Sequence, residues 1–274
     1  MNEARSLCPP GVHIAGSRPQ VVGVLQSTFP DRLPPLELLD GASLFLDFDG
    51  TLVELAERPD GVAVDQRLHA VMHRLLDRLD GRVALISGRP ADQVRTLFGE
   101  TVLTVVGSHG MEYRFADGRT AEAERPVGLS DALAAMHALA ETCPGVLVED
   151  KPLGAALHYR QVPEREAACQ ALAEQLAGAH GLYLQGGKMM VEVRASGGDK
   201  GAALHKLMSE PKLASTRPLF MGDDLTDEPG FAAAVALGGA GILVGPARAT
   251  SATYRLPDVN AVLSWLEAAT GTTA

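Results

Sequence analysis

The stretch SLFLDFDGTLVEL, residues 43–55, joins an apolar run to two carboxylates and decides the fold class. Its LFL segment is short and continuously apolar, which is typical of a strand covered by helices on both faces of a parallel sheet. In open α/β sheets the ligand crevice lies beyond the carboxyl ends of the strands, where Asp47 and Asp49 stand. Period-two alternation puts both carboxylates on one side and turns Phe48 into the core.

Two carboxylates this close repel each other unless a cation joins them. A divalent metal is the simplest such cation, and hard oxygen ligands suit Mg²⁺. An Asp-rich turn that closes the strand is the competing interpretation, because Asp and Gly are ordinary turn residues. A calcium loop is excluded, since the D-x-D-x-D-G pattern with its later Glu is absent. On this stretch alone, turn and active site are equally open.

The composition limits the class of protein. The 274 residues suffice for one large domain or two small ones. A formal net charge of −10 and a pI near 5.3 argue against nucleic acid or an anionic membrane as the main partner. The cysteines, Cys8, Cys143 and Cys169, lack metal-ligand spacing and favour a reducing compartment. No signal h-region or membrane span is evident, so we expect a cytoplasmic protein. We also expect a monomer.

Strands and helices alternate after the first strand. Residues 65–80 repeat apolar side chains at helical spacing, and the apolar strands VALISGR and TVLTVVGSHG are separated by a helix that opens at Pro90. This order predicts parallel pairing with right-handed crossovers, hence a doubly wound α/β sheet. The ends of its strands would gather Asp47, Ser87 and residues 107–109 along one edge.

The middle of the chain has a different pattern. Strand candidates GVLVED and AALHYR, a helix in PEREAACQALAEQLAG and a hairpin in GLYLQGGKMMVEVRA, turning at Gly186-Gly187, indicate a small α+β module with a mainly antiparallel sheet. The parallel pattern then resumes with a helix from Gly198 and the strands PLFMGDD and GILVG. The predicted organisation is an N-terminal extension over 1–40, a core over 41–120 and 196–274, and an inserted module over 121–195.

A second acidic cluster, MGDDLTDE, also ends an apolar strand. One interpretation is structural, with Thr226 as a helix N-cap and Asp227 in the first turn. That interpretation leaves Asp223 and Asp224 unexplained beside the first acidic cluster. Two acidic clusters at strand ends of one sheet therefore favour a divalent metal site.

Lys200, in GGDKGAAL, falls in the first turn of a helix, where the helix dipole mildly disfavours a cation. Beside a metal, its ammonium together with Ser87 and backbone N–H groups would neutralise a phosphoryl group during transfer. Taken alone, such a lysine is more often a solvated surface residue.

In this order, DFDGT, SGR, the lysine of GGDKGAAL and GDDLTDE resemble the four motifs of the haloacid dehalogenase (HAD) superfamily of phosphatases. More narrowly, GSHGMEYR, EDKPLGAALHYR and GGKMMVEVR resemble the trehalose-6-phosphate phosphatase family over most of residues 41–270. The resemblance implies an HAD-like, Rossmannoid parallel-sheet core with the inserted α+β module as a cap. It also implies a Mg²⁺-dependent phosphatase of trehalose biosynthesis that hydrolyses trehalose 6-phosphate.

The resemblance assigns roles to individual residues. Asp47 would attack phosphorus and form an aspartyl-phosphate, and Asp49 would protonate the departing sugar oxygen and then activate water. Ser87 and Lys200 would bind the phosphoryl oxygens. Magnesium would be held by Asp47, the backbone carbonyl of Asp49 and Asp223, with Asp224 and Asp227 supporting the shell.

Charged residues recur along the strands of the module. Alternation would put Lys188, Met190, Glu192 and Arg194 on one face, where mixed donors and acceptors suit a hydroxyl-rich neutral ligand; a solvated outer sheet face is the simpler interpretation. By resemblance, the main sugar contacts are Glu149, Lys188, Glu192 and Arg194. For His109 a structural role at the strand end is preferred, although it is counted in the expected substrate-binding set. That set is Ser87, Gly88, Arg89, His109, Glu149, Lys151, His158, Arg160, Lys188, Glu192 and Arg194.

Two alternatives stay open. One is a related capped phosphatase that acts on sucrose 6-phosphate or another glycosyl phosphate. The other is a sugar-phosphate sensor that retains the fold without turnover. Asp49 argues against the sensor, because only hydrolysis of an alkyl phosphate needs an acid two residues after the acceptor.

Overall fold

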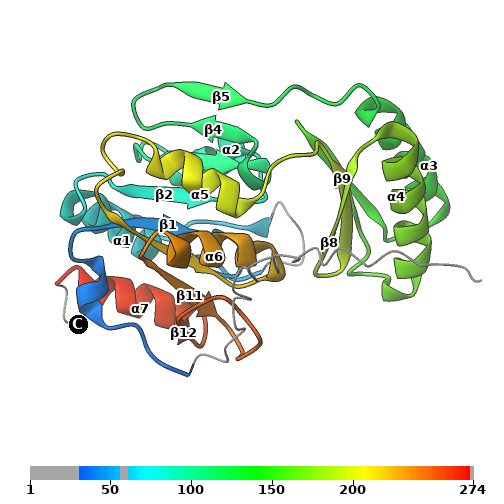
Figure 1. Ribbon diagram of the computed structural model, residues 1–274. Helices are drawn as coiled ribbons and strands as arrows, with labels where there is room; N and C mark the ends of the chain where they lie inside the picture. The colour runs from blue at the N-terminus through cyan, green and yellow to red at the C-terminus, as the bar shows by residue number, and fades with distance from the viewer. Residues whose placement is uncertain (1–30, 56–60, 272–274) are drawn as a thin grey trace, which may run out of the picture.

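The computed structural model of this chain describes residues 31–55 and 61–271. Its larger sheet has the strand order β12-β11-β10-β1-β2-β3-β4-β5 (Figure 1). Six strands pair in parallel, and β4 and β5 add antiparallel at one edge. The strands are β1 Ala42–Leu46, β2 Val83–Ile86, β3 Thr104–Gly107, β4 Glu112–Arg114, β5 Thr120–Glu122, β10 Arg217–Gly222, β11 Ala240–Val244 and β12 Tyr254–Leu256.

Helices cover both faces of this sheet. One face packs against α1, α2 and α7, and the other against α5 and α6 (Figure 1). β1 is buried along its whole length, which explains its unbroken apolar sequence, and Phe48 is fully buried as predicted. The predicted α/β fold class is confirmed. The helices are α1 Gln66–Arg78, α2 Ala91–Phe98, α5 Lys200–Met208, α6 Glu228–Ala236 and α7 Val259–Ala269, with 3₁₀ turns η1 Leu36–Leu39, η3 Ser108–Gly110 and η5 Leu225–Asp227.

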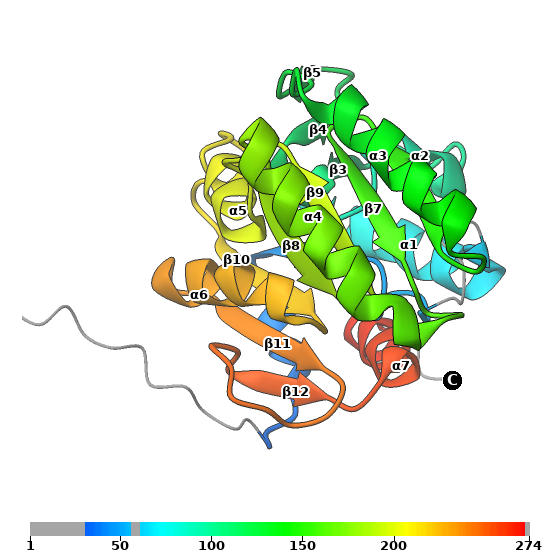
Figure 2. The ribbon, with the colours of Figure 1, turned by 90° about the vertical axis from the view of Figure 1, so that its right-hand side faces the viewer.

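A second, antiparallel sheet has the order β6-β7-β9-β8. Only one of its faces is covered by α3 and α4 (Figure 2), where Leu157 and Val191 pack with Met136 and Cys169. The uncovered face points toward the carboxyl ends of the parallel strands. The elements are β6 Leu147–Lys151, β7 Gly154–His158, β8 Tyr183–Gly187, β9 Met190–Arg194, α3 Leu129–Thr142, α4 Glu166–His180 and η4 Pro163–Arg165.

The predicted hairpin exists, but its turn lies two residues later than predicted. Gly187 pairs with Met190, so Lys188 and Met189 form the turn, and Met189 takes the left-handed conformation at φ 61°. Gly187 packs closely against the Met190 side chain, and a Cβ there would meet Met190 Sδ at 2.6 Å. Lys188 therefore leaves the strand alternation predicted for it, whereas Glu192 keeps its place.

The predicted N-terminal extension falls mostly outside the described residues, and so does Cys8. Its last ten residues, 31–40, are described, and they pack on the core. There η1 contacts α7, and the Trp265 indole N–H donates to the Pro34 carbonyl at 2.7 Å. Within 31–55 and 61–271, none of the helices is both long enough and apolar enough to cross a membrane.

Candidate active site

A cleft lies between the carboxyl ends of the parallel strands and the uncovered face of the smaller sheet. It collects most of the predicted site residues in one place. Predicted residues that line it are Asp47, Asp49, Gly88, Arg89, His109, Glu149, Lys151, His158, Arg160, Lys188, Glu192, Lys200, Asp223 and Asp224. Three others, Ser87, Arg194 and Asp227, are buried and hydrogen-bond to residues of this lining.

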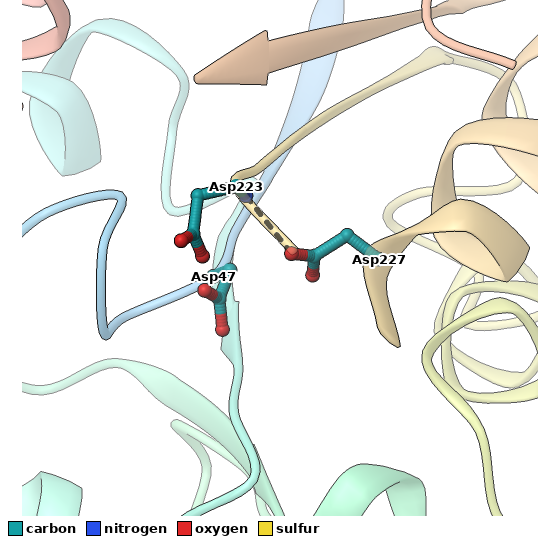
Figure 3. Close-up of side chains that lie close together, drawn as sticks. All are labelled: Asp47, Asp223 and Asp227. Atoms are coloured by element: carbon teal, nitrogen blue, oxygen red, sulfur yellow. Dashed lines mark hydrogen bonds between the residues drawn. The ribbon is translucent and has the colours of Figure 1, made fainter. Parts of the chain in front are cut away.

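Three carboxylates converge at the floor of the cleft. Asp47 follows β1, while Asp223 and Asp227 follow β10, and one oxygen of each lies within 4.8 Å of the others (Figure 3). The Asp227 carboxylate is held in place by the backbone N–H of Asp223 at 2.9 Å. Parallel pairing of β1 with β10 brings these distant segments together.

Lys200 balances part of this negative charge. Its Nζ donates to Asp47 Oδ1 at 2.7 Å and to Asp227 Oδ1 at 2.6 Å, and its residue is only 3% exposed. Asp199 caps α5 by accepting from the Ala202 N–H. The cap fixes where the helix begins, with Lys200 as its first residue. Burial raises the pKa of Asp47 well above its usual value, against the lowering effect of Lys200, and the charges of Asp227 and Asp223 raise it further. Burial thus disfavours the charged form of Asp47 even beside Lys200.

Asp223 has the same character. Burial raises its pKa, despite a 2.7 Å hydrogen bond from Lys188 Nζ across the cleft. Gly50 is required beside it: its φ is +81°, and a Cβ there would lie 2.3 Å from Asp223 Oδ2. Three converging carboxylates offer hard oxygen donors, which fit a divalent cation such as Mg²⁺.

The N-cap of η5 is not the residue that the sequence suggested. Asp224, not Thr226, is the N-cap: its Oδ1 accepts from the Leu225 N–H at 2.6 Å at the start of η5. The alternative with Thr226 as the cap is therefore wrong. The Asp224 backbone N–H also donates to Asp227 Oδ2 at 2.9 Å, so Asp224 and Asp227 form a capping box.

Asp49 is held by Arg89 through two hydrogen bonds. Arg89 Nε lies 2.6 Å from Asp49 Oδ2, and Nη2 lies 2.8 Å from Oδ1. Ser87 Oγ in turn accepts from the Arg89 backbone N–H at 3.1 Å. The arginine predicted as a substrate contact thus orients the carboxylate of Asp49 in the present arrangement.

His109 sits in a strained loop after β3. Ser108 and His109 both have positive φ, 46° and 55°, which is unusual for residues other than glycine. Burial, with the charges of Lys200, Lys151 and Arg194, holds the pKa of His109 well below its usual value, so the ring is neutral. The imidazole occupies the space a Cβ on Gly88 would need, at 2.6 Å.

The uncovered face of the smaller sheet carries paired charges. Lys151 Nζ donates to Glu192 Oε2 at 2.6 Å and lies 3.8 Å from Glu149 Oε2, and all three face the cleft. His158 Nε2 lies 2.8 Å from Glu149 Oε2. Gly154 leaves room for them, because a Cβ there would lie 2.8 Å from Glu192 Oε1. Donors and acceptors thus alternate on this face of the sheet.

A family comparison identifies the relationship. The trehalose-phosphatase family matches residues 45–260, a span that contains every site residue described above. The chain belongs to the trehalose-phosphatase family. It is therefore a phosphatase, and the resemblance inferred from its motifs is confirmed.

Individual relatives agree. The chain is 38% identical to a probable trehalose-phosphate phosphatase of Sinorhizobium fredii, over 82% of this chain and 86% of that protein. It is also 38% identical to trehalose-6-phosphate phosphatase of Escherichia coli, over 81% and 84%. The fold matches the C-terminal domain of trehalose-6-phosphate phosphatase of C. albicans with a TM-score of 0.78 at 22% identity, covering 90% of this chain and 99% of that domain.

Two site residues of this trehalose-phosphatase family member were not predicted. Glu112 is 2% exposed and accepts hydrogen bonds from Ser108 Oγ and from the Ala91 N–H, so it supports the strained loop. Gln185 lines the cleft and contacts His109. The motif GSHGMEYR contains Glu112 and the predicted hairpin GLYLQGGKMMVEVRA contains Gln185, but neither residue was assigned a role.

Proposed function

We propose that this phosphatase hydrolyses trehalose 6-phosphate to trehalose and phosphate, with Mg²⁺ as its cofactor. The observation that carries the proposal is one cleft with two unlike walls. The wall of Asp47, Asp49 and Lys200 suits phosphoryl transfer, and the wall of Glu149, Lys151 and Glu192 suits hydroxyl groups. The names of the curated relatives support the choice of substrate.

Asp47 is the proposed nucleophile. Its Oδ1 accepts a hydrogen bond from Lys200. Its Oδ2 accepts only a long hydrogen bond, 3.4 Å, from Thr51 Oγ1, so Oδ2 is the freer atom for attack on phosphorus. The P–O bond to the sugar breaks as the Asp47–P bond forms. Water then hydrolyses the aspartyl-phosphate and regenerates the carboxylate. Lys200 and Ser87 are proposed to bind the phosphoryl oxygens.

Asp49 is the proposed general acid and base. It would protonate the departing sugar oxygen and later remove a proton from the attacking water. Arg89 fixes the orientation of this carboxylate through its two hydrogen bonds. Asp49 stands two residues after the nucleophile, so both can reach the same phosphate.

Asp47, Asp223 and the backbone carbonyl of Asp49 are the proposed holders of Mg²⁺, with Asp227 and Asp224 supporting them. When bound, the ion would offset charge on the carboxylates and on the transferring phosphoryl group. Three carboxylates converge here against two ammonium groups, those of Lys200 and Lys188, and this supports the assignment.

Residues 121–195 are the proposed cap, and 41–120 with 196–274 the catalytic core. Closure of the cap would exclude water while its charged face holds the disaccharide, with Glu149, Lys188, Glu192 and Arg194 as the main contacts. We also propose that the protein acts as a cytoplasmic monomer. The free thiols of Cys143 and Cys169 suit a reducing compartment.

The test is phosphate release from trehalose 6-phosphate, sucrose 6-phosphate, glucose 6-phosphate and a small aryl phosphate, each with Mg²⁺ and with chelator. We expect metal-dependent preference for trehalose 6-phosphate and no turnover by Asp47→Asn. Preference for another member would overturn the substrate assignment but keep the core chemistry. No phosphate release from any member of the panel would favour a sugar-phosphate sensor.

A further inference from the structure

Gln185 connects the two walls of the cleft through the two ends of one amide. On the core side, its Nε2 lies 2.9 Å from His109 Nε2. On the side of the smaller sheet, its Oε1 accepts from Arg194 Nε at 2.9 Å. Gln185 itself belongs to β8, so the amide spans from the smaller sheet to the loop after β3.

The bond to Arg194 fixes the orientation of the amide. Because Oε1 faces an obligate donor, the NH₂ group must face His109. His109 Nε2 then acts as acceptor, and its proton lies on Nδ1. The low pKa of the buried imidazole agrees with this neutral form. Arg194, Gln185 and His109 thus form one chain of hydrogen bonds, the relay, in which His109 is the final acceptor.

Arg194 extends the relay to the chain segment that returns to the core. Its Nη1 donates to the Ala195 carbonyl at 3.1 Å, and its Nη2 to the Gly198 carbonyl at 3.0 Å. That segment ends at Asp199, the cap of α5. Gly198 packs against the His109 loop, since a Cβ on it would lie 3.1 Å from the His109 carbonyl.

We propose that Gln185 is a positioning residue, a latch that holds the smaller sheet closed on the core by joining His109 to Arg194. This inference rests on the proposed function, because closure matters most for a substrate that touches both walls. No apolar isostere can replace the residue, since the position needs a donor toward His109 and an acceptor toward Arg194.

The first experiment compares Gln185→Met with Gln170→Met, a control on the exposed surface of α4. We expect Gln185→Met to lower kcat/KM for trehalose 6-phosphate by at least about tenfold, the effect of about 1.4 kcal/mol, and aryl phosphate turnover far less. Equal losses on both substrates, or no loss, would overturn the latch.

The second variant, Gln185→Glu, tests the direction of the hydrogen bonds. A carboxylate still accepts from Arg194 but offers no N–H to neutral His109, whereas protonated His109 could donate to it. Its activity relative to wild type should therefore rise as the pH falls from about 8 to about 6. The charged groups around His109 are Lys200, Lys151, Arg194 and Glu192, and they are the same in both proteins. A ratio independent of pH would contradict the relay.

Hydrogen exchange gives a readout that needs no substrate. Gln185→Met should accelerate amide exchange in residues 107–111 and 195–199, while Gln170→Met should not. Unchanged exchange in both segments would sink the latch. If wild-type protein does not hydrolyse trehalose 6-phosphate but Gln185→Met still accelerates exchange, the substrate proposal alone is refuted.

Discussion

Arg89 and Asp49 form a two-point contact, Nε to Oδ2 at 2.6 Å and Nη2 to Oδ1 at 2.8 Å, between segments 40 residues apart in the chain. This geometry holds the carboxylate in one plane beside Asp47. A single point charge would not fix that plane, so lysine cannot replace the arginine.

Arg89→Lys should therefore slow the step that needs a proton. We expect kcat for trehalose 6-phosphate to fall by about 10- to 100-fold, because an alkyl oxygen leaves poorly without protonation, and kcat for an aryl phosphate to fall less. Steady-state kinetics on both substrates measure this. Arg165→Lys, on the exposed η4 turn, is the control. Equal losses would instead indicate that Arg89 binds the phosphate.

Lys200→Met should destabilise the metal-free protein. The substitution leaves Asp47 and Asp227 buried without their shared cation, which costs about 3–5 kcal/mol. Urea unfolding in chelator gives the free energy, and added Mg²⁺ should recover part of it. Lys212→Met, at an exposed lysine near Asp80, should change it little. A stable variant would show that the carboxylates do not depend on Lys200.

Asp223 and Asp224 should differ in their effect on metal use. Asp223→Asn should raise the Mg²⁺ concentration for half-maximal activity by about tenfold or more. Asp224→Asn should change it much less, because asparagine also caps a helix and the side chain points to η5. A Mg²⁺ titration of both variants decides the matter. Equal shifts would place Asp224 at the metal.

Stability should depend on pH through His109. Because its folded pKa lies well below the usual value of 6.5, the unfolded chain binds a proton at mildly acidic pH that the folded chain excludes. Its contribution is complete above about pH 6.5 and is lost as the pH falls toward the folded pKa.

We expect the unfolding free energy of His109→Gln to decline less steeply than wild type between about pH 7 and pH 5. Urea titrations at fixed pH values measure the slopes. His137→Gln, on the exposed side of α3, serves as the control and should follow wild type. Parallel curves for His109→Gln and wild type would contradict the buried, neutral imidazole.

Glu192→Gln should affect the sugar more than the phosphate. The amide keeps the volume but weakens the 2.6 Å bond from Lys151, and it accepts sugar hydroxyls less strongly. We expect kcat/KM for trehalose 6-phosphate to fall at least about tenfold more than for an aryl phosphate. Glu174→Gln, exposed on α4, should be neutral. Matched losses on both substrates would remove Glu192 from the sugar site.

Much of the fold followed from local patterns. The buried run before Asp47, the helical period over 65–80 and the order of strands predicted the parallel sheet, because burial on two faces leaves a continuous apolar signature. The short strands β4, β5 and β12 and the helix α3 were not predicted. A three-residue strand carries too little periodicity to recognise.

By itself, the sequence determined which acidic residues meet at one edge of the sheet, because parallel strands must end there. Only the tertiary structure decided the partners. Arg89 meets Asp49, and Gln185 meets His109 from 76 positions away. The position of the hairpin turn at Lys188 and Met189, with Gly187 paired to Met190, was likewise not evident from the Gly186-Gly187 pair. Such contacts depend on distances between segments, which no local pattern records.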